Sequence, residues 1–370
     1  MATGVLYFLL CVCVLIQWGY VFYYFLPFYF YTPPLADPEQ SPKPVSVIIA
    51  AHNELYNLQR LLPAVLSQQY PVFEIIVVDD RSTDGTTDYL AETQNKFRNF
   101  RYIKIENTDG TINQKKYALT QGVGLARFEY LLFTDADCMT LSNNWIGEIM
   151  SGFTSGVEMV LGYSPYRKKP GFLNHLIRFE TLLSAIQYLS FSVKGRAYMG
   201  VGRNLSYTKK CFYESNGFTS HINILGGDDD LFVQDAALRH KVNIAISKES
   251  QTESIPKQTY SEWVIQKRRH LNVGRYYKLA EKLRVGIFML SNIFFYLTAI
   301  FLLFVPDNLI FLGILFTLRS IVVYFVYVLL AQKIKEPLSV FLLPVLDLVY
   351  FLNYLMLGAS VLILNKVRWK

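Results

Sequence analysis

Acidic side chains follow three apolar runs of the chain. Glu54 follows residues 45–50 (VSVIIA), Asp79 and Asp80 follow residues 73–78 (FEIIVV), and Asp135 and Asp137 follow residues 129–133 (EYLLF). Carboxylate oxygens are hard ligands, so an Asp-x-Asp pair suits Mg²⁺ or Mn²⁺. Clustered carboxylates repel one another unless a cation or hydrogen-bond donors join them. If the three runs end at one place, the pattern predicts a divalent-metal site.

The elements that must position these side chains are strands and helices in alternation. Strands are predicted at residues 45–50, 73–78, 100–105 and 129–133, and helices at residues 55–69, from a cap at Ser82, Thr83 and Asp84 to residue 96, and at residues 113–126. Fully apolar strands alternating with helices indicate a mainly parallel sheet covered on both faces, hence the α/β class. Such sheets bind ligands outside the carboxyl ends of their strands, where the acidic residues stand.

The kind of ligand is narrowed by motifs that the sequence lacks. No P-loop is present, and no GxGxxG follows the first strand, which weakens ATPase and dinucleotide interpretations. A metal held by few carboxylates completes its shell with water and substrate phosphates, and a nucleotide diphosphate fits that requirement. A lone Asp-x-Asp is a common pattern, and its position among three acidic strand ends makes it informative.

A second acidic run stands at residues 226–231 (GGDDDL), before a segment of helical appearance. A positioned carboxylate can take the proton of an acceptor hydroxyl, so Asp228 or Asp229 is a candidate base. Three adjacent aspartates are expected to raise one another's pKa, which would suit that role. The alternative is a solvated acidic turn at a helix start, and without the other motifs this interpretation would be preferred.

Charge is scarce in this chain of 370 residues. Charged residues make up 18% and hydrophobic residues 52%, whereas soluble domains carry roughly a quarter charged residues. Abundant core formers exclude a disordered chain, and four cysteines without paired spacing exclude a disulfide scaffold or a zinc site. We expect one α/β domain together with membrane segments in a reducing compartment.

The apolar stretches lie at both ends of the chain. Residues 1–36 carry no charge, and the stretch is too long and too aromatic at its end for a signal peptide, so we expect an uncleaved anchor. Three further apolar segments follow between residues 285 and 365, with Arg319 and Asp347 as lone charges inside them. A lone charge at mid-bilayer is costly, so we expect these two to pair. Snorkelling of one side chain, or a re-entrant segment, is the alternative.

Orientation follows from the basic residues. Placing residues 37–284 in the cytoplasm fits their basic balance and puts Lys333 and Lys335 on the same side. Four full spans would then leave the basic tail (Lys366, Arg368, Lys370) outside, so either the last segment re-enters or the tail is an exception.

Taken together, the motifs resemble a membrane-anchored family 2 glycosyltransferase with a GT-A nucleotide-sugar fold. The resemblance rests on VSVIIAAHNE, VVDDRSTDGT, QKKYALTQG, LLFTDADC, GGDDDLF and QKRRH, in this order, over about residues 44–275. It implies transfer of a sugar from a nucleotide diphosphate donor, usually UDP-linked, with inversion at the anomeric carbon. It also implies a divalent cofactor, Mg²⁺ or Mn²⁺, between which the motifs do not choose.

The resemblance also implies roles for single residues. On the donor side, the nucleoside pocket would be lined by Ala51, Asn53 and Glu54, and Asp80 would bind the base while Asp79 supports the turn. Lys115 would lie near the nucleotide, with Lys116 as the alternative. Asp137 would bind the metal, and Asp135 would contact the metal, the donor sugar or the ribose. Asp228 matches the catalytic base, and Asp229 is the alternative one residue on. Residues 200–205 (GVGRNL) resemble the loop that approaches the acceptor in this family.

The run at residues 266–270 (QKRRH) resembles the QxxRW signature of the family. Arg269 would hold the diphosphate and Gln266 would line the acceptor channel. His270 stands where tryptophan is usual, and its smaller ring offers less area for stacking on a sugar. Attraction of this basic run to anionic lipid is the alternative.

The expected organisation is a transmembrane anchor at 1–36, a linker at 37–44, a GT-A domain at 45–275 and a membrane region at 276–370. The predicted function is transfer to a lipid-linked or glycan acceptor at the cytoplasmic face of a membrane, with membrane lipid as a further partner. A processive polysaccharide synthase and an inactive sugar-binding scaffold are the alternatives. The net charge of +7 suggests nucleic acid, but the basic residues lack a base-stacking pattern, so no such partner is expected.

Overall fold

The computed structural model of the protein describes residues 2–34, 42–107, 112–305 and 308–363. The chain divides into two compact units. One is helical and combines residues 1–31, 168–190 and 257–370, and the other is an α/β unit made of residues 32–167 and 191–256. The expected domain bounds stay a prediction. Most of the expected linker and the basic tail lie outside the described residues.

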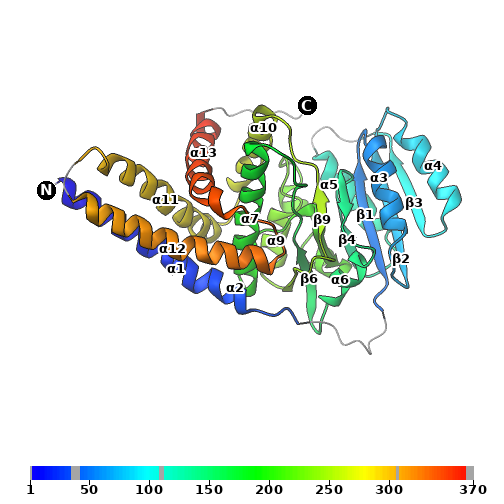
Figure 1. Cartoon of the computed structure of the whole chain (residues 1–370). Helices are drawn as coiled ribbons and strands as arrows, with labels where there is room; N and C mark the ends of the chain where they lie inside the picture. Colours follow the sequence, from blue (N-terminus) through cyan, green and yellow to red (C-terminus); the bar gives the residue numbers. More distant parts are fainter. Residues whose placement is uncertain (1, 35–41, 108–111, 306–307, 364–370) are drawn as a thin grey trace. The chain divides into compact units, whose positions relative to one another are not determined.

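The α/β unit contains a seven-stranded sheet with the strand order β3-β2-β1-β4-β7-β6-β8 (Figure 1). Its strands are β1 Val45–Ala51, β2 Phe73–Asp80, β3 Phe100–Ile105, β4 Tyr130–Phe133, β6 Val157–Gly162, β7 Leu205–Thr208 and β8 Lys241–Ala245. The four strands predicted from the sequence pair in parallel, and β7 runs antiparallel to both β4 and β6. The mainly parallel sheet confirms the predicted α/β class.

Helices cover both faces of this sheet. They are α3 Leu55–Leu66, α4 Thr86–Lys96, α5 Gln114–Leu125, α6 Trp145–Ser151, α8 Lys209–Glu214 and α9 Asp230–Ala236. One face packs α3, α4 and α6 into a core with alternate residues of β1, among them Val45, Val47 and Ile49. On the other face, α5 comes so close to β1 that a Cβ at Gly122 would lie 2.6 Å from Ile48. The sheet is therefore held rigidly on both sides.

The start of α4 differs from the expectation. The predicted cap was the cluster from Ser82 to Asp84, whereas the helix begins at Thr86 after Gly85, whose φ of 89° suits glycine. Asp84 instead accepts hydrogen bonds from the amides of Leu55 and Thr86. Asp84 therefore ties the loop after β2 to the beginning of α3, which fixes the two strand ends relative to each other.

The helical unit contains the apolar segments. Its elements are α1 Ala2–Tyr20, η1 Val21–Phe25, α2 Leu26–Phe30, most of α7 Phe172–Val193, α10 Tyr260–Gly274, α11 Leu279–Leu302, α12 Leu309–Lys333, η4 Val340–Leu342 and α13 Leu343–Ile363. Four helices are long and apolar enough to cross a membrane, at residues 3–30, 279–302, 309–333 and 340–360. This matches the four segments expected from the sequence, and α1, α11 and α12 lie side by side (Figure 1).

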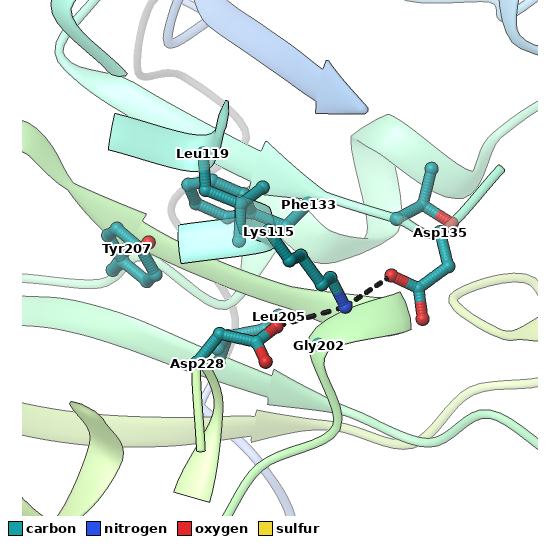
Figure 2. A pocket seen from close by; sticks show the side chains of 9 residues that line it. Lys115, Leu119, Phe133, Asp135, Gly202, Leu205, Tyr207 and Asp228 are labelled. Carbon is teal, nitrogen blue, oxygen red and sulfur yellow. Dashed lines mark hydrogen bonds and ion pairs between the residues drawn. The ribbon is translucent and has the colours of Figure 1, made fainter. Parts of the chain in front are cut away.

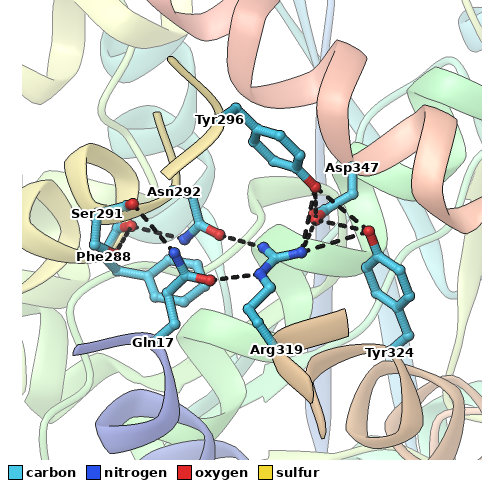
Figure 3. A network of polar contacts seen from close by, with 8 residues as sticks. All are labelled: Gln17, Phe288, Ser291, Asn292, Tyr296, Arg319, Tyr324 and Asp347. Carbon is cyan, nitrogen blue, oxygen red and sulfur yellow. Dashed lines mark hydrogen bonds and ion pairs between the residues drawn. The ribbon is translucent and has the colours of Figure 1, made fainter. Parts of the chain in front are cut away.

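A buried polar network joins these apolar helices (Figure 3). Arg319 of α12 donates to Asp347 of α13 at 2.6 Å, and neither side chain is exposed. The remaining donors of its guanidinium reach Gln17 of α1 at 2.6 Å and Asn292 of α11 at 2.6 Å. The expected pair is thus present, and it is part of a larger network that ties four helices together.

Candidate active site

The centre of the candidate site is a lysine between two carboxylates (Figure 2). Lys115, in the first turn of α5, places its Nζ 2.8 Å from Asp135 and 2.9 Å from Asp228. Burial opposes the charge on Lys115, but the two carboxylates raise its pKa well above the usual value. The ammonium therefore stays charged and links the end of β4 to the segment before α9.

These three side chains share a small pocket of the α/β unit with residues from the loop before β7. It is lined by Lys115, Leu119, Phe133, Thr134, Asp135, Gly202, Leu205, Tyr207 and Asp228. The aliphatic and aromatic side chains come from α5, β4 and β7, so one wall is apolar and the other carries the charges. Such a pocket can hold a polar group against an apolar surface.

Asp228 and Asp229 have different surroundings. Both carboxylate oxygens of Asp229 are occupied, since Oδ1 accepts from the amide of Asp230 and Oδ2 from the amide of Gly202, each at 2.9 Å. Asp229 is also the N-cap of α9. Asp228 faces the pocket and pairs with Lys115. The two preceding glycines, Gly226 and Gly227, have positive φ, which turns the chain between them.

The expectation that the three aspartates raise one another's pKa is wrong for Asp228. Burial does raise the pKa of its carboxyl, but the positive charge of Lys115, helped by its hydrogen bond, outweighs burial and lowers the pKa below the usual value. The sequence could not indicate this, because Lys115 lies 113 positions away along the chain. Asp228 is thus a carboxylate at neutral pH.

Lys116, the rival of Lys115, has a different role in the structure. Its side chain is fully buried, and Nζ donates to the carbonyl oxygens of His221 at 2.5 Å and Ile224 at 3.0 Å. The amide of Asn113 adds a hydrogen bond to the carbonyl oxygen of Ile222 at 2.9 Å. Burial lowers the pKa of Lys116 to about 8. Lys116 therefore holds the loop that leads to Asp228 against the start of α5.

The expected nucleoside-pocket residues lie at the ends of β1 and β2. Asn53, with a positive φ of 55°, accepts from the amide of Thr83 at 2.8 Å and donates its own amide to Ser82 at 2.8 Å. Asp80 is buried at the end of β2 and pairs with Arg81 at 2.8 Å. Ala51 ends β1 and is buried. Arg81 was not singled out in the sequence, although it follows the Asp-Asp pair directly.

The acidic strand ends converge, as the sequence predicted. Burial, and after it the charges of Asp137 and Asp135, raise the pKa of Glu54. Reduced solvation and then the charge of Asp135 raise the pKa of Asp137, while the positive charge of Arg203 opposes this shift. Carboxylate oxygens are the ligands that a hard divalent cation prefers, so Asp137 and Asp135 remain the metal ligands expected from the motif.

A separate group of potential ligands stands elsewhere in the α/β unit. Glu158, Glu214 and His240 bring ligand-type atoms within 4.8 Å of one another. Glu158 already accepts from Lys210 at 2.7 Å and pairs with His240. Glu158 is thus already bonded to two neighbours. The metal site expected from the sequence is a different one, at the strand ends.

Arg203 and Tyr166 are site residues that the sequence reasoning missed. The guanidinium carbon of Arg203 lies 4.4 Å from the centroid of the Tyr166 ring, and Nη2 donates to the carbonyl oxygen of Ser164 at 2.8 Å. Arg203 belongs to the GVGRNL run that was noted for its resemblance to an acceptor loop. The arginine itself gave no separate signal, because only folding brings it near the Asp-x-Asp pair.

The residues of the QKRRH run lie on α10 of the helical unit. The helix starts with a capping box, in which Thr259 and Glu262 bond reciprocally. Nζ of Lys267 pairs with the buried carboxylate of Glu180, on α7, at 2.8 Å, and the indole N–H of Trp263 donates to the same carboxylate at 3.0 Å. Gln266 and Arg269 are half-buried and His270 is exposed, and their roles toward a substrate stay predictions.

Comparison with known proteins adds the family. Residues 46–214 match Glycosyl transferase family 2. The chain is 36% identical over 93 residues to a poly-beta-1,6-N-acetyl-D-glucosamine synthase of Staphylococcus epidermidis, covering 25% of this chain and 21% of that protein. It is 27% identical over 178 residues to a 4,4'-diaponeurosporenoate glycosyltransferase of Staphylococcus aureus, covering 47% of this chain and 46% of that protein. The chain thus spans less than half the length of these relatives.

Among solved structures, the chain is similar to the mannosyltransferase PcManGT from Pyrobaculum calidifontis in complex with GDP-Man and Mn²⁺. The TM-score is 0.59 at 16% identity, over 95% of this chain and 99% of that chain. A likeness at this identity concerns the fold. The mainly parallel sheet is thus that of the GT-A fold class. More particularly, residues 46–214 are the part of the chain that matches Glycosyl transferase family 2.

Proposed function

We propose that the chain is an inverting glycosyltransferase that moves a sugar from a nucleotide diphosphate donor, UDP-linked in the first instance, to a lipid-linked or glycan acceptor. The observation that carries the proposal is the position of Lys115, 2.8 Å from Asp135 and 2.9 Å from Asp228. It brings Asp135, after β4, and Asp228, before α9, into one pocket. Donor-side and acceptor-side chemistry can therefore meet there.

In the proposed reaction, Asp228 accepts the proton of the acceptor hydroxyl. The hydroxyl oxygen then forms a bond to the anomeric carbon, while the bond from that carbon to the diphosphate breaks and its electron pair leaves with the diphosphate. Attack from the side opposite the leaving group inverts the anomeric centre. Support for Asp228 over Asp229 comes from the hydrogen bonds that occupy both oxygens of Asp229.

The donor side of the proposal uses the convergent strand ends. Asn53, Glu54, Asp80 and Ala51 would line the nucleoside pocket, and Asp135 would contact the donor sugar or ribose. A Mg²⁺ or Mn²⁺ ion held by Asp137 and Asp135 would stabilise negative charge on the leaving diphosphate. Lys115 would add a fixed positive charge next to Asp135.

The acceptor side is inferred from the rest of the chain. Four helices suited to a membrane make a lipid-linked acceptor the natural substrate. Lys333 at the end of α12 and Lys335 just after it favour a cytoplasmic α/β unit. Arg269 would hold the diphosphate, Gln266 would line the acceptor channel, and His270 offers less stacking area than the usual tryptophan.

The experiment that tests the function is nucleotide release by the detergent-purified full chain. UDP- and GDP-sugars would be offered with Mn²⁺, Mg²⁺ or a chelator, with and without membrane lipid extract. We expect metal-dependent release from one donor, stimulated by the lipid extract. Asp137→Ala should abolish release, whereas Glu92→Ala, which removes an exposed carboxylate on α4, should leave it unchanged.

The outcomes separate the proposed function from its alternatives. Release that adds many sugars to one acceptor, seen as a ladder of products, would identify a processive synthase. Nucleotide binding without release from any donor or lipid fraction would identify an inactive sugar-binding domain. No binding of any nucleotide would contradict the proposal altogether.

A further inference from the structure

The loop before β7 presents an arginine to the acidic strand ends. Arg203 lies in the 3₁₀ turn Gly202–Asn204, and its neighbour Gly202 is fixed by Asp229, whose Oδ2 accepts the amide of Gly202 at 2.9 Å. The carbonyl oxygen of Arg203 accepts from the hydroxyl of Thr252 at 2.9 Å. The backbone at this arginine is therefore held from two sides.

The guanidinium of Arg203 is also oriented. It lies over the Tyr166 ring at 4.4 Å, and Nη2 donates to the carbonyl oxygen of Ser164 at 2.8 Å. Nε is buried without a hydrogen-bond partner. A guanidinium has five N–H donors, so those not used within the protein can bond to an anionic group.

A short chain of contacts places this guanidinium next to the Asp-x-Asp pair. Tyr166, the ring beneath Arg203, forms a β-bridge with Ser254. The hydroxyl of Ser254 lies 3.0 Å from Sγ of Cys138, which directly follows Asp137. In agreement with this placement, the charge of Arg203 acts on both Asp135 and Asp137.

We propose that Arg203 binds a substrate phosphate beside the Asp-x-Asp pair, and specifically the diphosphate of the nucleotide-sugar donor. The inference rests on the proposed function. A planar guanidinium that is stacked on an aromatic ring and already fixed in its loop loses little entropy when it binds a phosphate in the plane of its fork. The negative charges of Asp135 and Asp137 repel a diphosphate, and the positive charge of Arg203 offsets that repulsion.

The donor is favoured over the acceptor because of the neighbours of Arg203. The phosphate of a lipid-linked acceptor has the same chemistry. However, the contacts of Arg203 run through Tyr166 and Ser254 to Cys138, next to the residue expected to face the donor's metal, Asp137. Asp228, the candidate base for the acceptor hydroxyl, is instead paired with Lys115.

The test is equilibrium binding to the purified full chain in Mn²⁺, with UDP and GDP compared with uridine and guanosine. Arg203→Met should weaken binding of the preferred diphosphate about 10- to 100-fold, the usual effect of losing a charged hydrogen-bond donor. Binding of the matching nucleoside should change less than about twofold. Arg127→Met, at the other end of β4 on an exposed side chain, is the matched control and should bind normally.

Arg203→Lys keeps the positive charge but loses the planar arrangement of N–H donors. This variant provides the test if Arg203→Met does not fold. For this variant we expect a several-fold loss of diphosphate affinity with no loss for the nucleoside. Equal diphosphate affinity in wild type and in a folded Arg203→Met would overturn the assignment. If that variant instead raises the KM of the lipid acceptor, the phosphate belongs to the acceptor and the donor assignment is wrong.

The proposed function fails in a different way. If the wild-type chain binds neither UDP nor GDP in Mn²⁺, the nucleotide-sugar function itself is wrong and the role of Arg203 falls with it. If the wild type binds one of them and releases it from a sugar donor, the function stands whatever the arginine variants do.

Discussion

Lys115 Nζ lies 2.9 Å from Oδ2 of Asp228, so the candidate base and the cation beside the donor-side carboxylates are directly paired. The pairing keeps Asp228 ionised and restrains its carboxylate in the pocket. A leaving diphosphate would compete with Asp228 for the same ammonium. Under the proposed function, the pair would link the state of the donor site to the basicity of Asp228.

The first prediction concerns Asp228. Asp228→Asn should abolish sugar transfer, by 1000-fold or more in kcat, because an amide cannot take the acceptor's proton; general base catalysis alone is worth about 10²–10⁴-fold. Nucleotide affinity should change little. The measurements are kcat by nucleotide release and the Kd of UDP or GDP for the same variant.

Asp229→Asn is the comparison for Asp228. It removes an acceptor from the amides of Gly202 and Asp230, so we expect lower thermal stability with residual transfer. Complete loss of transfer in a stable Asp229→Asn, with transfer retained in Asp228→Asn, would show that the base is one residue further along the chain.

The second prediction concerns Lys116. Lys116→Met keeps the volume but loses the hydrogen bonds to the carbonyl oxygens of His221 and Ile224, so the loop before Asp228 should loosen. We expect kcat to fall about tenfold or more, while the donor KM stays within about threefold, as for a residue that orients the base without touching the donor.

Lys209→Met is the matched control for Lys116→Met. Its ammonium also donates to a backbone carbonyl, that of Ala126, but at the opposite end of β4. This variant should lose stability at most. If both variants lose kcat equally, the effect of Lys116 is general destabilisation and not the positioning of Asp228.

The third prediction is an acid-induced loss of stability through His221. Burial, and then the nearby charge of Lys116, lower the pKa of His221 to about 4, against 6.5 when unfolded. The unfolded chain therefore binds the proton first as the pH falls. The stabilisation is complete above pH 6.5 and is lost progressively down to about pH 4, by up to roughly 3 kcal/mol.

The pH effect is measured by thermal unfolding at pH 7, 5.5 and 4. His221→Phe should flatten this dependence, whereas His175→Phe, at a half-buried position of α7, should leave it as in the wild type. Parallel curves for the wild type and His221→Phe would refute the assignment.

The fourth prediction concerns the four long apolar helices. Asp347→Ala leaves the guanidinium of Arg319 buried without its counter-charge, and Arg319→Ala leaves the carboxylate of Asp347 unpaired. We expect the double variant to lose less stability than the sum of the losses in the two single variants. The difference, which is the coupling free energy, should be about 1–3 kcal/mol. Unfolding in detergent or mild denaturant measures the cycle, and simple additivity would contradict a functional pair.

The strands that carry the donor-side motifs could be predicted because their signals are local. The runs 45–50 and 73–78 are apolar, and each is followed by residues that prefer turns. The structure extends the second of them so that Asp79 and Asp80 belong to β2 itself. The convergence of Glu54, Asp135 and Asp137 followed from parallel topology alone.

Other parts of the site depend on contacts across long stretches of sequence, which no local pattern reports. The charge of Lys115 lowers the pKa of Asp228, and contacts with Tyr166 and Ser164 orient the guanidinium of Arg203. The antiparallel insertion of β7 between β4 and β6 also has no local signature.

The network around Arg319 has a consequence for biogenesis. Gln17 of α1 and its partner Arg319 of α12 are 302 residues apart along the chain. The amide of Gln17 can therefore meet this guanidinium only after the α/β unit, which lies between them in the sequence, has been synthesised. A variant truncated between the α/β unit and α12 would keep Gln17 and lose this partner.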